Sequence, residues 1–341
     1  MRRTAPVRAA LRSEMLAPRY AGVPTFMRAP LVPREALSSV DVGLFGVPFD
    51  GGVTNRPGAR LGPREVRNAS SMMRAVHSSR HRARPFEQCA VGDLGDVPIE
   101  HVYSVGRAHE EIEAFASAAL AAGVTPLAIG GDHSVTLPLL RAASAAHGAP
   151  LGLIHVDAHC DTWCEQWGER DHHGAPMRRA VECGAVDPAR VVQIGIRGPQ
   201  NFTDGWDWAE ASGFTVLYME RCVELGVAGV VDAARAVVER GGGGGGPVYL
   251  SFDIDALDPA FAPGTGTPEC GGFTTREAMQ LLRGLRGLAP RLCGADVVEV
   301  APPFDVGAPA GGGLTSLAGA TIAYEILCLL SESRAPLPRN A

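Results

Sequence analysis

Three short polar stretches carry the residues best suited to chemistry, and each follows an apolar run directly. They read GGDHS (130–134), HVDAHCDTW (155–163) and SFDIDALDP (251–259). Side chains alternate along a strand, so acids and imidazoles spaced two residues apart point to the same side. Together the stretches supply two imidazoles and four carboxylates, from His133, Asp157, His159, Asp161, Asp253 and Asp255.

This much negative charge near the end of a buried strand needs a compensating cation. Buried carboxylates repel one another, and an isolated one tends to take up a proton. Two divalent metal ions remove that conflict, and a carboxylate-rich set with two imidazoles favours ions such as Mn²⁺. A pair of such ions lowers the pKa of water and supplies a nucleophile near neutral pH. The sequence therefore predicts a dinuclear hydrolytic centre.

Simpler interpretations of individual residues stay open. Asp132 is placed to cap a following helix, and Asp258, beside Pro259, is typical of a turn. Cys160 and Cys164 allow thiolate ligation of zinc, but a C-x-x-x-C pair among oxygen donors is a weak zinc pattern. Three such stretches in one chain favour the metal centre over three unrelated turns.

The elements that position these stretches are apolar runs of strand length alternating with longer amphipathic segments. This alternation predicts an α/β fold with a mostly parallel sheet covered by helices on both faces. Ligands of such folds bind beyond the carboxyl ends of the strands, where the three stretches fall. The expected strands are 42–47, 126–130, 151–157, 191–196, 214–218, 248–254 and 293–299. The expected helices are 105–122, 135–147, 175–184, 227–240, 275–287 and 314–330.

Composition narrows the class of protein. The chain has 341 residues and a formal net charge of −6, which argues against a nucleic-acid or anionic-membrane surface. No uninterrupted apolar run approaches the roughly 18 residues typical of a membrane span. The eight cysteines form no CxxC pair, which is typical of reduced thiols and favours the cytoplasm.

Three further segments have plain interpretations. The arginines of the first 13 residues precede any acid, so an organellar transit peptide is the alternative to a simple N-terminal arm. GGGGGG (241–246) predicts a helix stop and connection, and APAGGG (308–313) predicts a loop with a lid role left open.

The three stretches resemble the signatures of the ureohydrolase superfamily, which contains arginases, agmatinases and guanidino-acid hydrolases. GVPFDGGVTNRPGARLGP (46–63) also resembles the agmatinase or guanidino-acid hydrolase branch. The resemblance covers about 40–340 and implies a three-layer α/β/α fold, with 1–35 as an N-terminal arm and 36–341 as one catalytic domain. It implies hydrolysis of a linear guanidino compound to urea and an amine by a hydroxide that bridges two Mn²⁺ ions.

The resemblance also implies roles for individual residues. His133 and Asp161 match the family's ligands of one ion, and His159 and Asp255 match those of the other. The remaining two aspartates of the set match the bridging pair.

Beyond the metal ligands, His173 matches the histidine that relays a proton to the leaving amine, and its neighbour His172 stays a competing candidate. Glu299 matches the carboxylate that grips the guanidinium. Asp161 and Asp255 are expected to handle protons as the intermediate collapses.

Substrate binding is expected to involve Trp163 and Thr267 as well as Glu299. Arginases carry an asparagine where this chain has Trp163, so the resemblance disfavours L-arginine and favours agmatine or a guanidino acid. Trp167 is a further candidate for the entrance. The carboxylate of a guanidino acid would need a cation, for which the arginines near the motifs are candidates: Arg56, Arg60, Arg170 and Arg197.

Other functions stay open. A guanidine or biguanide hydrolase using Ni²⁺ is one, and a noncatalytic subunit of a ureohydrolase complex is another. A deacetylase-type site, with one zinc, one histidine and two aspartates, fits less well because the six-residue set is intact. The resemblance implies a homotrimer or homohexamer acting on a small guanidino substrate, without nucleic acid or membrane partners.

Overall fold

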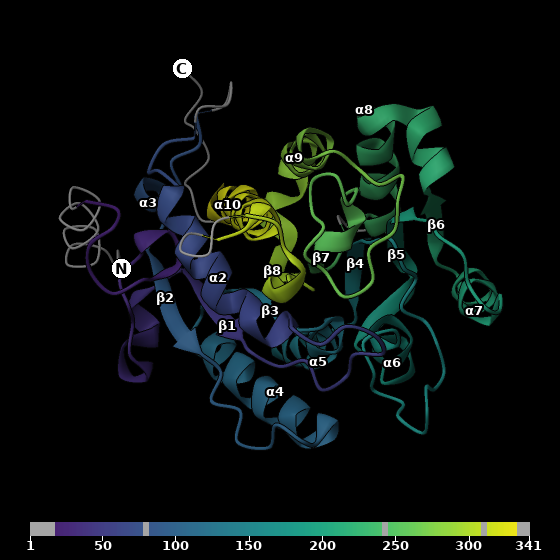
Figure 1. The fold of residues 1–341 in the computed structure, drawn as a ribbon, viewed down its shortest axis with the longest axis horizontal. Helices are drawn as coiled ribbons and strands as arrows, with labels where there is room; N and C mark the ends of the chain where they lie inside the picture. The colour runs from purple at the N-terminus through teal and green to yellow at the C-terminus, as the bar shows by residue number, and fades with distance from the viewer. Residues whose placement is uncertain (1–17, 78–81, 241–244, 308–311, 333–341) are drawn as a thin grey trace.

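The computed structural model describes residues 18–77, 82–240, 245–307 and 312–332. Within them the chain forms one eight-stranded sheet, and every pair of neighbouring strands is parallel (Figure 1). Across the sheet the order is β2-β1-β3-β8-β7-β4-β5-β6. The strands are β1 (Val42–Val47), β2 (Val91–Asp96), β3 (Thr125–Gly130), β4 (Leu151–Val156), β5 (Val186–Ile196), β6 (Thr215–Tyr218), β7 (Val248–Asp253) and β8 (Leu292–Val298).

Helices cover both faces of the sheet, which confirms the predicted three-layer fold (Figure 1). One apolar layer packs α2, α3, α8, α9 and α10 against the sheet. The opposite layer packs α4, α5, α6 and α7. The helices are α2 (Gly62–Ala69), α3 (Pro85–Gln88), α4 (Val105–Ala121), α5 (Thr136–His147), α6 (Pro176–Glu182), α7 (Asp204–Ser212), α8 (Met219–Val238), α9 (Thr275–Gly284) and α10 (Leu314–Glu332).

Local sequence explains where these elements begin and end. The central strands are buried throughout, as expected for continuous Val, Ile and Leu runs in a parallel sheet covered on both faces. Helix α9 begins with a capping box, in which Thr274 and Glu277 each bind the other's backbone N–H. Helix α5 ends at His147 and is followed by Gly148, whose φ of +64° costs glycine less than other residues.

The element boundaries differ from the sequence-based expectation in several places. The sequence does not predict strand β2, because VGDLGD carries two aspartates and two glycines, nor does it predict helices α2, α3 and α7. The helix expected at 227–240 begins at Met219 and is kinked at Gly226, whose φ is +64°. The helix expected at 275–287 ends as an α-helix at Gly284 and continues as a 3₁₀ helix, Leu285–Arg291.

Helix α10 is the one helix among the described residues that is long and apolar enough to cross a membrane, judged by length and composition. The mean hydropathy of its most apolar stretch is 1.5, but 83% of that stretch is buried inside the protein. It packs against α2, α9 and β8 as a core helix of the sheet's first layer.

Two predicted flexible regions are only partly covered. Positions 241–244 of the glycine run and 308–311 of the APAGGG loop lie outside the described residues, as do positions 1–17 of the expected N-terminal arm. The described end of that arm packs on the protein: Phe26 and Met27 are buried, and Leu31 pairs with Asp93 of β2.

The strand order brings the chemical stretches together. Strands β3, β8, β7 and β4 are consecutive neighbours in the sheet, and their carboxyl ends lie at the same edge. The stretches that follow β3, β4 and β7 therefore meet there, with Glu299 directly after β8 between them.

Candidate metal centre and substrate pocket

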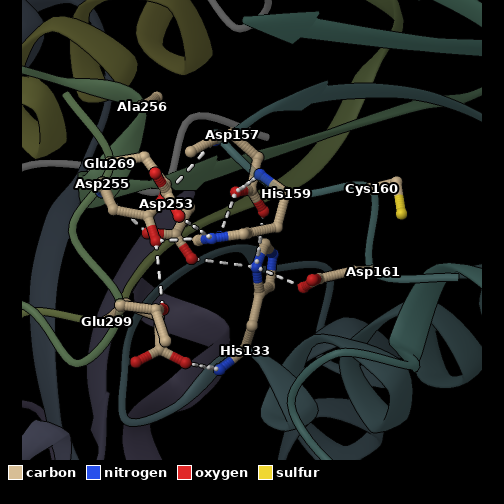
Figure 2. Close-up of polar contacts among 12 residues, drawn as sticks. His133, Asp157, His159, Cys160, Asp161, Asp253, Asp255, Ala256, Glu269 and Glu299 are labelled. Carbon is tan, nitrogen blue, oxygen red and sulfur yellow. Dashed lines mark hydrogen bonds and ion pairs between the residues drawn. The ribbon is translucent and has the colours of Figure 1, made fainter. Parts of the chain in front are cut away.

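The six predicted metal ligands come together at the carboxyl edge of the sheet (Figure 2). Five of them have less than a tenth of their surface exposed, and His159 is half-buried. Their side chains form the strand-end cluster, which consists of His133, Asp157, His159, Asp161, Asp253 and Asp255.

His133 lies at the centre of one half of this cluster. Its Nδ1 atom is 3.1 Å from Asp157 Oδ2, 3.0 Å from Asp161 Oδ2 and 3.1 Å from Asp253 Oδ2. Three carboxylate oxygens thus converge on one nitrogen atom in a buried position. This arrangement suits a small cation held between them.

The other ring nitrogen of His133 explains which way the imidazole faces. Ser251 donates its hydroxyl hydrogen to Asp296 Oδ1 at 2.7 Å, so its oxygen is left to accept from His133 Nε2 at 2.9 Å. Thr136 holds the second oxygen of Asp296 at 3.0 Å. A neutral His133 therefore carries its proton on Nε2 and has no hydrogen on Nδ1, the atom that faces the three carboxylates. Its lone pair points at the carboxylates, as a metal ligand's would.

His159 organises the second half. Its Nδ1 atom is 3.1 Å from Asp255 Oδ2 and 3.5 Å from Asp157 Oδ1. Asp157 therefore presents one oxygen to each imidazole, as a bridging ligand would. Two overlapping groups of donors share Asp157, and this pattern is compatible with a dinuclear site.

The charge of the cluster also fits a cation. Burial raises the pKa of Asp253 well above its usual range, and the charges of Asp255 and Asp157 raise it further. Burial would lower the pKa of His133, but its hydrogen bonds to the surrounding carboxylates raise it well above the usual value. The cluster therefore attracts positive charge, whether from protons or from metal ions. The donor set fits two divalent ions without fixing which metal they are.

Backbone conformation at this edge is unusual at two functional positions. Asp161 has a φ of +52° and Glu299 a φ of +64°. These angles lie in the left-handed region, which residues other than glycine rarely adopt. Beside them, a side chain at Gly131 would place its Cβ 1.9 Å from the carbonyl oxygen of Phe49. The GGDHS stretch therefore requires glycine at this position.

A cavity of about 620 Å³ opens from the cluster and contains the other predicted site residues. His173 and Glu299 line it together, with His173 Nδ1 2.9 Å from Glu299 Oε1. On its other side, His173 Nε2 is 2.7 Å from Thr54 Oγ1. Glu299 Oε1 also accepts from the backbone N–H of His133 at 2.8 Å, whereas its buried Oε2 has no hydrogen-bond partner among the described residues.

His173 and Glu299 stabilise each other's charged forms. Burial would lower the pKa of His173, but the Glu299 carboxylate raises it to about 9. Burial would raise the pKa of Glu299, yet the charge of His173 holds it below its usual range. Both shifts have the same cause, a proton on His173 Nδ1 that faces Glu299 Oε1.

The remaining predicted pocket residues take different positions. His172 also lines the cavity, but its Nδ1 accepts from the N–H of Gly174 at 3.1 Å, and burial lowers its pKa to about 4. Trp163 and Thr267 line the cavity, and Thr267 Oγ1 is 3.4 Å from Asp255 Oδ2. Trp167 lies exposed at the rim, with a left-handed φ of +52°.

A family model described as "Arginase family" matches residues 40–329, most of the chain. The chain belongs to the arginase family. This confirms the family resemblance of the three motifs.

Individual arginase-family proteins are similar over nearly their whole length. The chain is 53% identical to guanidinopropionase of Pseudomonas aeruginosa over 319 residues, covering 93% of this chain and 95% of that protein. It is 43% identical to human "Guanidino acid hydrolase, mitochondrial", covering 92% and 84%. Among solved structures, proclavaminate amidino hydrolase from Streptomyces clavuligerus matches with a TM-score of 0.82 and 39% identity, covering 93% and 100%. The arginase-type fold is thereby confirmed.

None of the four arginines that the sequence suggests for a substrate carboxylate lines the cavity of this arginase-family chain. Arg197 is buried and donates to the carbonyl oxygens of surrounding loops, among them Asp255 O at 2.7 Å and Glu269 O at 2.7 Å. It therefore holds the loop after β7 in place. Arg60 pairs with Asp50, and Arg56 stacks on a phenylalanine ring.

Several residues that support the site are not singled out by the sequence. His155 Nε2 is 2.7 Å from Asp157 Oδ2, and the Gln193 side chain lies 3.0 Å from His155 Nδ1. Ser251 and Thr54 orient the histidines described above. The sequence contains one usable signal: His155 and Ser251 each lie two residues before a predicted ligand on the same strand, so they share its side of the sheet.

The simpler interpretations hold for residues outside the cluster. Asp132 caps the turn after β3, accepting from the N–H of Ser134 at 3.0 Å, and Asp258 accepts from three backbone N–H groups of its own loop. The sulfur of Cys160 points away from the cluster (Figure 2). The candidate ligand groups found among the described residues contain no cysteine, so nothing favours the thiolate zinc site.

Proposed function

We propose that this protein hydrolyses a linear guanidino compound, either a guanidino acid or agmatine, to urea and an amine. Membership of the arginase family and the similarity to a guanidinopropionase support this chemistry. The observation that carries the proposal is the position of His133, whose Nδ1 atom faces three carboxylate oxygens at 3.0 to 3.1 Å. Buried carboxylates gathered without a cation destabilise a fold, whereas the same arrangement binds metal ions well.

We assign two divalent ions to the strand-end cluster. His133 and Asp161 would hold one ion, and His159 and Asp255 would hold the other, with Asp157 and Asp253 shared between them. The carboxylate-rich donor set favours Mn²⁺, and Ni²⁺ is the alternative. When bound, such a pair lowers the pKa of water and supplies a nucleophile near neutral pH.

The chain's own residues then orient the substrate. Glu299 has one carboxylate oxygen, Oε2, without a hydrogen-bond partner among the described residues, and it borders the cavity. It would accept N–H groups of the planar guanidinium through charge-assisted hydrogen bonds. Holding the guanidinium there fixes its carbon above the cluster. Part of the entropic cost of bringing the reacting groups together is then met on binding, which lowers the barrier of the reaction.

Proton delivery is assigned to His173 rather than His172. His173 lies against Glu299, and its pKa of about 9 keeps a proton on the ring at neutral pH. That proton would go to the nitrogen of the departing amine, which makes the amine a better leaving group. Asp161 and Asp255 would handle protons on the cluster side, with Thr267 and Trp163 lining the path of the substrate.

Three further features of the protein stay predictions. The residues 36–341 are expected to act as one catalytic domain, preceded by the segment 1–35. Assembly into a homotrimer or homohexamer is expected from the family resemblance. The cytoplasm is the expected compartment, with an organellar matrix as the alternative for a chain similar to a protein named mitochondrial.

The test is urea release from metal-stripped protein reloaded separately with Mn²⁺, Ni²⁺ and Zn²⁺. Each form is offered agmatine, L-arginine, guanidine, a biguanide, and guanidino acids of several chain lengths. We expect Mn²⁺-dependent urea from a guanidino acid or agmatine and little from L-arginine. Absence of urea in every combination would contradict the proposed function. If urea is released only with Ni²⁺ and only from guanidine or a biguanide, the substrate and the metal proposed here are wrong and the alternative function is correct.

A further inference from the structure

Beside the cavity, three arginines share one glutamate. Glu182, at the end of α6, pairs with Arg170 at 3.3 Å, with Arg178 at 2.9 Å and with Arg179 at 2.6 Å. Three guanidinium charges against one carboxylate leave this group with a formal charge of +2. This group, the Glu182 cluster, is therefore a local source of positive potential in a protein whose net charge is −6.

Arg178 is the member of the Glu182 cluster that reaches the cavity wall. Its Nε atom bonds to Glu182 Oε1, and its guanidinium lies 4.8 Å from the ring centre of Trp208. These two contacts fix the plane of the guanidinium on a side chain that is only 19% exposed. The terminal Nη atoms form no hydrogen bond within the described part of the chain. Arg178 thus has a guanidinium of fixed plane and unused Nη donors at the cavity wall, and such a group can bind a carboxylate at two points.

The acids that line the same cavity do not cancel this charge. Asp161, Asp253 and Glu299 belong to the cluster end, where metal ions and the substrate's guanidinium would neutralise them. Glu165 and Asp204 lie at the wall but are exposed, so water and salt screen them more strongly than the mostly buried Arg178. Among the described residues that line the cavity, Arg178 is the one lysine or arginine.

We infer that Arg178 binds the carboxylate of a guanidino acid while Glu299 binds its guanidinium, so that this pocket selects guanidino acids over agmatine. The inference rests on the proposed function and deepens it by choosing between its two substrate classes. Arg178 acts on specificity alone, since it lies at the opposite end of the substrate from the reacting carbon. Arg178 thus takes the role of carboxylate-binding cation that the sequence suggests for Arg56, Arg60, Arg170 and Arg197.

The experiment compares substrates that differ only at the tail. Urea release is measured with 3-guanidinopropionate, 4-guanidinobutyrate, agmatine and 1-propylguanidine, which lacks the carboxylate. Wild type is compared with R178Q, with R178K and with R221Q, a control that removes the same charge from an exposed i,i+3 pair in α8. Melting curves followed by circular dichroism check that each variant is folded.

We expect R178Q to lower kcat/KM for the guanidino acids by about 10- to 100-fold, the loss expected for hydrogen bonds to a charged group. The loss should lie mainly in KM, and R178K should recover part of it. Activity on 1-propylguanidine should change by less than about twofold, because this substrate has no carboxylate and so makes no contact with Arg178 that the substitution could remove. R221Q should match wild type on every substrate.

Two results would overturn the inference while leaving the proposed function intact. One is a wild type that prefers agmatine, and the other is an R178Q variant that loses activity equally on all substrates. If wild type releases no urea at all, the proposed function fails, and calorimetric titration with 3-guanidinopropionate then tests Arg178 separately. Equal binding to folded wild type and folded R178Q, or binding to neither, would overturn the assignment.

Discussion

Two buried ionic groups in this protein differ in how their charges balance. The first is the strand-end cluster, with four carboxylates and two imidazoles. The second, the Glu325 group, joins α9 to α10: Glu325 is 3% exposed, with His77 Nε2 at 2.8 Å and Arg283 Nε at 3.1 Å from its oxygens. A stacked Tyr324 ring covers His77. Both groups are buried, but in the first the carboxylates outnumber the imidazoles that can take up a proton, whereas in the second a guanidinium and an imidazole face one carboxylate.

This difference separates a structural ion pair from a functional one. In the Glu325 group, a guanidinium matches a carboxylate at two points, so the folded protein leaves no charge uncompensated. In the strand-end cluster, four carboxylates face two imidazoles, so negative charge is left over even when both rings are protonated. Such an excess of one sign, placed at the inner end of a cavity, indicates a site completed by something outside the chain.

The largest expected effect that follows from this contrast is at Asp255. D255A should lower urea release by more than about 100-fold. This loss is larger than the loss of about 10- to 100-fold expected when a residue that only orients a metal ligand is removed. It should bind fewer than two metal ions per chain while keeping the wild-type circular dichroism spectrum. D258A is the matched control in the same stretch, because Asp258 bonds only to its own loop, and it should still bind two ions. Full activity in D255A would refute the two-metal assignment.

A smaller effect is expected at Ser251, which orients His133 from behind. S251A removes the acceptor for His133 Nε2, so the ring loses its preferred tautomer and its orientation. We expect metal affinity to fall by about 10- to 100-fold, measured by competition with a chelator. S144A, a serine bonded to a surface turn, should bind metal like wild type. Unchanged affinity in S251A would contradict the tautomer inferred for His133.

The smallest expected effect is at Glu325, and it should appear in stability alone. E325Q leaves the Arg283 charge without its carboxylate and should lower the free energy of unfolding by about 1–2 kcal/mol. The effect is modest because Arg283 is 32% exposed. Urea denaturation of the metal-loaded protein measures it, with E87Q, from an exposed pair, expected within about 0.5 kcal/mol of wild type. A loss of metal binding in E325Q would show that the two groups are coupled.

Much of the fold can be predicted because buried parallel strands are continuous apolar runs. All seven expected strands correspond to strands of the sheet. Strand β2 cannot be predicted in this way because Asp93 lies inside it, buried and paired with Arg67, a partner 26 positions away that no local pattern reveals. Helices α2 and α7 are missed because each is short and begins with residues typical of turns.

The strand-end cluster can be predicted because ligands concentrate at strand ends with a spacing of two. Of the rest of the pocket, the family resemblance gives His173, Glu299, Trp163 and Thr267, whereas the other residues come from loops whose positions depend on tertiary packing. Arg197 lies next to a strand end and has the charge that a substrate carboxylate needs, yet it donates to backbone carbonyls instead. Arg178 lies inside helix α6 and outside the motifs, so it carries no signal until the fold places it against the cavity.

Strand order has a consequence for how the site is made during protein synthesis. Strand β8 is the last strand along the chain, yet it lies between β3 and β7 and pairs with both of them. The loops that carry His133 and Asp253 can thus reach their final distance only after β8 has been synthesised and has paired with both strands. A nascent chain that stops earlier contains all six cluster residues but lacks the strand that lies between β3 and β7. Strand β8, which carries none of the six residues, is therefore needed to bring the two halves of the strand-end cluster together.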